Sequence, residues 1–157
     1  MVRLSMAKVR IIIDDLSPRR EQFSLWSIIY VKVNETCFPD DAWSDATSSV
    51  LVIWNTNTYK LLCGCAKYCE LPFMDGDFEI KLTATEKRLA QMSLCQDENE
   101  IEHFDDVDLL YFVRQLIAAS TKVLEYDKLT GKEQSVEMNT LANSLEKLRK
   151  KYMEFSP

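Results

Sequence analysis

The amino-acid sequence predicts an α+β fold, with an antiparallel sheet of about five to six strands and helices packed on one face, two of them C-terminal. Three observations lead to this prediction. Most of the first two thirds of the chain consists of short segments, β-branched or alternating in polarity, that are separated by turn signals. One segment with helical spacing interrupts them. The final third of the chain has helical spacing. This segregation of strands and helices is typical of an antiparallel sheet covered by helices.

Strand signals dominate the first 40 residues. Residues 7–13 are largely β-branched, and residues 25–33 are aromatic and β-branched with little alternation. The second segment therefore predicts a strand that is buried on much of both faces. Because Asn tolerates positive φ, Asn34-Glu35 is expected to form a hairpin turn into a short strand over residues 36–38.

Residues 45–62 have helical spacing instead. Their apolar side chains, Trp54 among them, fall on one stripe, which predicts an amphipathic helix. Ser44 or Asp41 is expected to cap its start, and Gly64 is suited to end it.

Strand signals return after residue 67. Residues 68–74 lead into Asp75-Gly76, the strongest short hairpin signal in the chain. Apolar and polar residues then alternate over residues 78–85 and again over residues 88–95. Such alternation predicts antiparallel strands with one face on the core and one face in water. The inward residues of the last strand are expected to be Ala90, Met92 and Leu94.

Two helices are predicted in the final third. Asp105 and Asp106 are expected to cap the first, Gly131 to end it, and the second covers about residues 134–152. Together these elements predict the following core: Trp26, Ile28, Val50, Trp54, Phe78, Ile80, Leu82, Leu109, Val113, Leu116, Leu145 and Leu148.

Length and charge limit the class of protein. The 157 residues, 46% of them hydrophobic, are expected to form one domain over residues 1–157. No run approaches the roughly 20 apolar residues of a membrane-spanning helix and no signal-peptide pattern is present, so we expect a cytoplasmic protein. The net charge of −6, without a basic stripe, argues against nucleic-acid and membrane partners. The one basic cluster complements a helix dipole: Lys147, Arg149, Lys150 and Lys151.

The five cysteines are expected to be reduced thiols, because their number is odd and no export signal is present. Cys63, Cys65 and Cys69 form a cluster that could supply ligands to a metal ion. Structural zinc sites pair such a motif with a second Cys or His pair, which the chain lacks, and the spacing of Cys95 and His103 does not supply one. We therefore predict no metal and no cofactor.

Catalytic signals are weak. Any Ser-His or Cys-His site must use His103, the one histidine, and its charged segment has no nucleophile elbow. A surface histidine beside carboxylates is the favoured interpretation, and we predict that the chain is not an enzyme. Two alternatives stay open: a small enzyme or ligand-binding domain with its site at the sheet–helix junction, and a protein with a structural or regulatory role.

A dense acidic run stands above this background. Seven of the twelve residues from 97 to 108 are acidic and no Lys or Arg interrupts them: Asp97, Glu98, Glu100, Glu102, Asp105, Asp106 and Asp108. A solvated loop running into an acid-capped helix would explain the last three but not the first four. Because an acidic patch steers a basic partner, we predict that these seven residues bind a basic protein.

Two motifs carry a resemblance to a known group. Phe38-Pro39-Asp40 followed by Trp43 and Asp45, and later Phe73-Met74-Asp75-Gly76, resemble small uncharacterised bacterial proteins, some of which look like the immunity partners of contact-dependent or polymorphic toxins. The chain departs from them at Glu35, where glycine is usual, and in its cysteine cluster. The resemblance implies a bacterial cytoplasmic home and carries over no functional residue. The predicted function is therefore a protein-binding module, most concretely an immunity-type inhibitor that occludes a basic toxin with its acidic surface.

Overall fold

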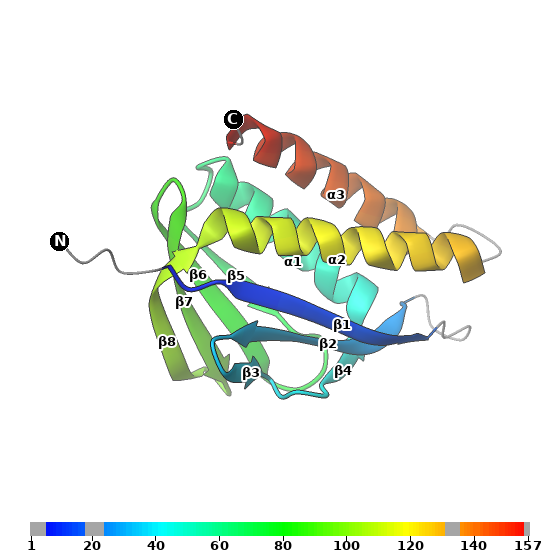
Figure 1. Cartoon of the computed structure of the whole chain (residues 1–157), viewed down its shortest axis with the longest axis horizontal. Coiled ribbons are helices and arrows are strands. Elements are labelled where there is room, and N and C mark those ends of the chain that lie inside the picture. The colour runs from blue at the N-terminus through cyan, green and yellow to red at the C-terminus, as the bar shows by residue number, and fades with distance from the viewer. Residues whose placement is uncertain (1–5, 18–23, 131–135, 156–157) are drawn as a thin grey trace.

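Two antiparallel sheets and three helices make up the fold over residues 6–17, 24–130 and 136–155, which the computed structural model describes (Figure 1). The α+β class is confirmed, but the strands form two sheets of four instead of one sheet of five to six. The elements in chain order are β1 (Val9–Ser17), β2 (Trp26–Val33), β3 (Thr36–Phe38), β4 (Ser44–Ala46), α1 (Thr47–Leu62), β5 (Tyr68–Pro72), β6 (Phe78–Glu86), β7 (Leu89–Gln96), β8 (Asn99–Asp108), α2 (Leu109–Thr130) and α3 (Val136–Phe155).

The first sheet is built around β2. β1 pairs with it antiparallel along its length, while β3 and β4 pair with it at opposite ends. The predicted turn between β2 and β3 is confirmed, with Asn34 at a φ of 54°. β4 was not predicted, and the caps expected at Ser44 and Asp41 are wrong. Pairing with β2 holds the chain extended up to Ala46, which is the N-cap residue of α1 and has no side-chain capping bond.

The second sheet has the order β5-β6-β7-β8, with neighbouring strands antiparallel. The predicted inward face of β7 is confirmed, since Ala90, Met92 and Leu94 are fully buried. β8 contradicts the reading of the acidic run as a loop, because most of that run pairs with β7. The predicted caps Asp105 and Asp106 are also wrong: they lie in β8, and the N–H of Tyr111 donates to Asp108 Oδ1 at 3.0 Å, so Asp108 caps α2.

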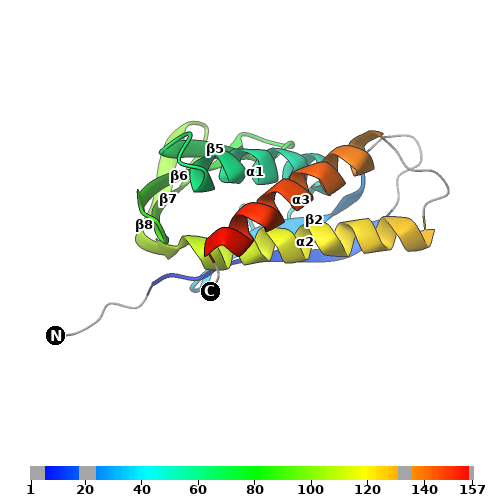
Figure 2. The same ribbon diagram turned by 90° about the horizontal axis from the view of Figure 1, so that it is seen from above.

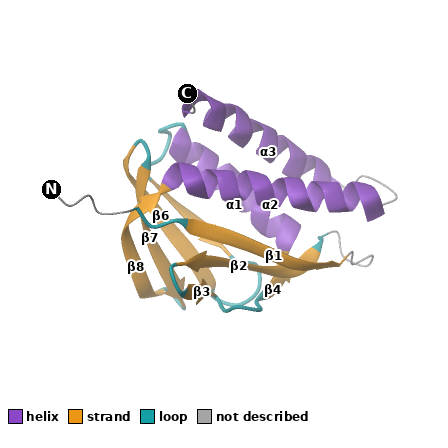
Figure 3. Cartoon of the chain, in the orientation of Figure 1, coloured by secondary structure: helices purple, strands orange, loops and turns teal. Residues whose placement is uncertain are grey.

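The three helices gather on one side of the strands (Figure 3). α2 lies along β1, α1 lies beside β5, and α3 packs across both of these helices (Figure 2). Glu137, in the first turn of α3, accepts hydrogen bonds from the hydroxyls of Ser48 and Ser49 in the first turn of α1. This carboxylate ties the two helix starts together. Gly131, the predicted end of α2, lies outside the described residues.

Nine of the twelve predicted core residues are buried, and all of these except Leu145 belong to one contiguous cluster of buried apolar side chains. Trp26, Ile28 and Phe78 are the exceptions and are half-buried. In β2 the buried positions are the alternate ones, from Ser27 to Val33. The residues at even and at odd positions of this strand are both largely apolar, so the sequence pattern did not specify which set faces the core.

Candidate functional site

The acidic run forms the outer hairpin of the second sheet. Asp97 and Glu98 are the two turn residues between β7 and β8, at φ values of 50° and 67°. The ladder then continues from the Gln96–Asn99 pair along β8, which is an edge strand. The run therefore consists of an exposed turn and a partly exposed strand, with fixed directions for its side chains.

The registers of three strand pairs define a solvent-facing surface on this sheet. One row across the four strands contains Glu70, Lys81, Ser93 and His103, and the next contains Pro72, Glu79, Cys95 and Glu100. Most of these side chains are half-buried or exposed, whereas the opposite face carries the buried residues of β6 and β7. We call this surface the outer face.

The seven predicted partner-binding residues do not all lie together. Glu100 and Asp105 both contact His103 on the outer face. Glu102 pairs with buried Leu94 and accepts a hydrogen bond from Thr36 Oγ1 at 3.1 Å, so it faces the first sheet instead. Asp108 is occupied as the cap of α2, and Asp106 is exposed beside the bridge from Ala7 to Val107.

A hollow of about 490 Å³ opens between the β5–β6 loop and the β7–β8 turn. The N–H of Asp97 donates to the carbonyl of Asp77 at 2.9 Å, which joins the two segments. Four carboxylates line the hollow beside apolar walls: Asp77, Glu79, Asp97 and Glu98 with Pro72, Phe73, Gly76 and Phe78. The sequence analysis missed Asp77 and Glu79 as site residues, although both occupy polar positions in and next to the alternating β6 segment.

A buried carboxylate holds the β5–β6 loop in place. Asp45 is fully buried, and its Oδ2 accepts hydrogen bonds from Trp43 Nε1 at 3.0 Å and from the N–H groups of Met74 at 3.0 Å and Asp75 at 3.2 Å. Its Oδ1 accepts the N–H of Ala46 at 2.7 Å. Four donors therefore offset the cost of burying this charge, and the loop that walls the hollow is held in a defined position.

Aromatic packing supports the same loop. The rings of Trp43 and Phe78 meet edge-to-face at 5.0 Å, and those of Trp54 and Phe73 do so at 5.1 Å. Gly76 has a φ of 68°, and a Cβ there would approach Trp43 and Phe78 to within 3.0–3.1 Å. The two motifs that carry the sequence resemblance thus pack against each other, and their residues have a structural role at this hollow.

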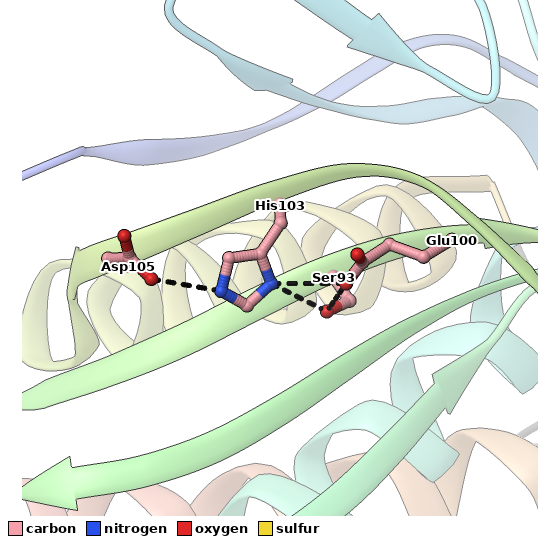
Figure 4. A network of polar contacts seen from close by, with 4 residues as sticks. All are labelled: Ser93, Glu100, His103 and Asp105. Carbon is pink, nitrogen blue, oxygen red and sulfur yellow. Dashed lines mark hydrogen bonds and ion pairs between the residues drawn. The ribbon is translucent and has the colours of Figure 1, made fainter.

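His103 lies between two carboxylates on the outer face (Figure 4). Its Nδ1 is 2.9 Å from Ser93 Oγ and 3.1 Å from Glu100 Oε1, and its Nε2 is 3.0 Å from Asp105 Oδ1. The predicted neighbourhood of carboxylates is confirmed. The hydrogen bond from Ser93, followed by the hydrogen bond and charge of His103, holds the pKa of Glu100 below its ordinary value, although desolvation opposes this.

The hydrogen bonds that connect Ser93, His103 and Asp105 resemble the connectivity of a catalytic triad. In a triad the serine hydroxyl donates to the imidazole, which removes the proton. Here the hydroxyl of Ser93 donates to Glu100 Oε1, and both ring nitrogens face carboxylates. The serine hydroxyl is therefore directed to a carboxylate instead of to the imidazole, and the ring links Ser93, Glu100 and Asp105 on the outer face.

The cysteine cluster is spread over different environments. Cys63 is half-buried, Cys65 is exposed and Cys69 is buried in β5, and all five cysteines are free thiols. Over the described residues no group of three or more His, Cys, Asp or Glu side chains is arranged to hold a metal ion. None of the helices in the described part of the chain has the length and apolar character needed to cross a membrane.

Comparison with known proteins adds no relative. No protein-family model matches the chain, and comparisons with curated proteins and with solved structures find no significant match.

Proposed function

We propose that this protein is a protein-binding module that occludes a basic partner with its outer face and the β7–β8 turn, as an immunity-type inhibitor of a basic bacterial toxin would. One observation carries the proposal: carboxylates from two different strands and two loops converge on one solvent-facing surface. Asp97, Glu98, Glu100 and Asp105 come from the β8 hairpin, while Asp77 and Glu79 approach from the β6 side.

Charge alone would steer a partner without holding it. A field of one sign raises the association rate, but residence time depends on apolar side chains at the centre of an interface. Ile101 is 56% exposed on the β8 hairpin, Met74 is 41% exposed on the β5–β6 loop, and Phe78 lines the hollow. These side chains would supply the apolar contacts within the acidic surface.

Protection of a sheet edge is the competing explanation for the acidic run. Charged side chains on an edge strand oppose pairing with another chain, and the inward-facing Glu102 fits that purpose. Edge protection does not account for Asp77, because it lies in a loop, or for Glu79, because β6 is an inner strand; Glu79 is paired with Lys81 at 3.7 Å, so among the described residues of this surface the unpaired charge beyond the edge strand is that of Asp77. The extension of negative charge beyond the edge strand favours a binding surface.

The test compares two variants that remove the same charge. The surface variant neutralises three carboxylates of the proposed binding surface: Asp97→Asn, Glu98→Gln and Asp105→Asn. The control variant neutralises three exposed carboxylates of α2 and α3: Glu125→Gln, Glu146→Gln and Glu154→Gln. The partner to be tested is a basic protein encoded by a neighbouring gene, because an immunity gene lies beside its toxin gene. We expect the first variant to lower its association rate roughly tenfold at low ionic strength and to converge with wild type at high salt. Equal rates for the two variants at low salt would overturn the proposal.

A further inference from the structure

A second cavity lies at the opposite end of β6 from the acidic hollow, where α1 and α3 both end beside the β6–β7 turn (Figure 1). Its volume is about 500 Å³, which falls within the range of about 300–1,000 Å³ typical of small-molecule sites. It occupies the junction between the second sheet and the helices. The cavity is distinct from the outer face and from the acidic hollow.

The charge of this cavity is opposite to that of the protein as a whole. Lys67, Lys87 and Lys151 line it with one carboxylate, Glu86, although the chain has a net charge of −6. Lys151 is paired with Glu154 at 2.7 Å. Among the described residues, no carboxylate lies within ion-pair distance of Lys67 or Lys87. Two ammonium groups are therefore available to an anion.

Helix capping would be an ordinary reason for lysines at this position, but the helix ends already have donors. The N–H groups of Cys63, Gly64 and Cys65 donate to carbonyls of the last turn of α1, at 2.9–3.2 Å. At the end of α3, Arg88 Nη2 donates to the carbonyl of Phe155 at 3.0 Å. The lysine side chains are thus not required as hydrogen-bond donors to these helix ends.

The floor of the cavity is apolar. Leu61, Leu62 and Leu109 are buried residues of the core, and Phe155 covers them from the end of α3. We propose that this cavity binds an amphipathic anion, whose acidic group lies between Lys67 and Lys87 and whose apolar part packs on Leu62, Leu109 and Phe155. Charge complementarity selects the acidic group, which we call the head. Removal of the apolar part, the tail, from water stabilises the complex.

Calorimetric titration with octanoate, below its micelle concentration, and with 1-octanol tests the head and tail separately. We expect octanoate to bind about twofold to 25-fold tighter than 1-octanol, because each of two exposed charge pairs contributes a factor of roughly 1.4 to 5. The variant Lys67→Gln with Lys87→Gln should lose this preference. The matched control, Lys60→Gln with Lys147→Gln, removes two exposed lysines at another cavity between α1 and α3 and should keep it.

Two cysteines of the chain report where the probe binds. Cys63 lines the cavity, whereas Cys65, two residues away, is exposed and is not part of the lining. Saturating octanoate should slow alkylation of Cys63 severalfold and leave the rate at Cys65 unchanged, as measured by peptide mass spectrometry. Equal effects on the two thiols would place the probe elsewhere and overturn the proposal.

The anion could be a free molecule or the head of a lipid, and vesicles distinguish these sources. If octanoate saturates the site and the protein does not cosediment with phosphatidylglycerol vesicles, the natural ligand is a free anion. Cosedimentation that is lost in the Lys67→Gln, Lys87→Gln variant and absent with pure phosphatidylcholine vesicles assigns a lipid. Failure of both probes, or binding that is unaffected by the two lysine substitutions, overturns the inference whether or not the acidic outer face binds a partner.

Discussion

The carboxylate of Asp45 accepts a hydrogen bond from the backbone N–H of Met74, 29 positions further along the chain, at 3.0 Å. Asp45 belongs to β4 before α1, and Met74 belongs to the loop between β5 and β6. This contact joins the two sheets at the wall of the acidic hollow. Asp45 and Met74 belong to the two motifs that resemble other proteins. This contact gives both motifs a role in stabilising the fold.

Removal of this buried carboxylate should destabilise the protein strongly. Asp45→Ala leaves the N–H groups of Met74, Asp75 and Ala46 without their acceptor, and we expect a loss of about 3–5 kcal/mol in the free energy of unfolding. Urea denaturation measures it, with exposed Asp41→Ala as the control. A loss below about 1 kcal/mol for Asp45→Ala would show that the carboxylate does not hold the loop.

Truncation of core side chains from two different layers should also be costly. Ile80 in β6 and Leu116 in α2 are fully buried, so replacement of either by alanine should cost about 2–5 kcal/mol through lost burial and a residual cavity. Ile101→Ala, at an exposed position of β8, is the matched control and should change stability by less than about 0.5 kcal/mol. Similar losses at all three positions would contradict the assigned burial.

The serine on the outer face should control the titration of its neighbour. Ser93→Ala removes the largest cause of the lowered pKa of Glu100, so we expect that pKa to move up toward 4.5, its ordinary value. Ser93→Thr keeps a hydroxyl and should preserve the lowered pKa. Carboxyl NMR titration measures both variants.

The pH dependence of stability follows from the same shift. Folding lowers the pKa of Glu100, so the ionised carboxylate stabilises the folded state at pH values above its ordinary pKa. This stabilisation is lost as the pH falls through the lowered pKa of the folded state. Ser93→Ala should therefore reduce the part of the acid-induced loss of stability that comes from this group. An unchanged Glu100 titration in Ser93→Ala would rule out the serine as its cause.

The thiols of β5 and of the α1–β5 connection should differ in reactivity. Burial, with a smaller effect of Glu70, raises the pKa of Cys69 to about 12, whereas Cys65 is exposed. Because the thiolate is the nucleophile, Cys65 should be alkylated much faster than Cys69 at pH 8, as followed by mass spectrometry. Comparable rates at the two positions in the folded protein would contradict the burial of Cys69.

High pH should act on stability through the same cysteine. Because the pKa of Cys69 is raised in the folded state, its protonated thiol contributes fully to the free energy of unfolding below the ordinary pKa of 9.0. This contribution is lost as the pH rises toward about 12. The free energy of unfolding should therefore fall less steeply over this range in Cys69→Ala than in wild type. Urea denaturation at several pH values checks the slope, and equal slopes would contradict the shift.

The candidate site was only partly predictable. The acidic run was visible in the sequence, and two of its members, Glu100 and Asp105, do lie together beside His103. The opposite direction of Glu102 depends on its register against Leu94, which no local pattern specifies. A ligand site at the sheet–helix junction was an open alternative, but the lining of the cavity at the other end of β6 was not predictable, because Lys67, Lys87 and Lys151 come from three separate elements or turns.

The sequence by itself determined the elements whose signals are local. Periodic apolar positions predicted α2, α3 and the inward face of β7, and the backbone preference of Asn34 predicted its turn. Tertiary structure decided the rest: that the acidic run becomes β8, that β2 buries the alternation starting at Ser27, and that Asp45 is buried. The physical reason is that strand pairing, strand register and the acceptors of buried hydrogen bonds are set by residues distant in the chain, whereas helical periodicity and turn preference are carried by neighbours.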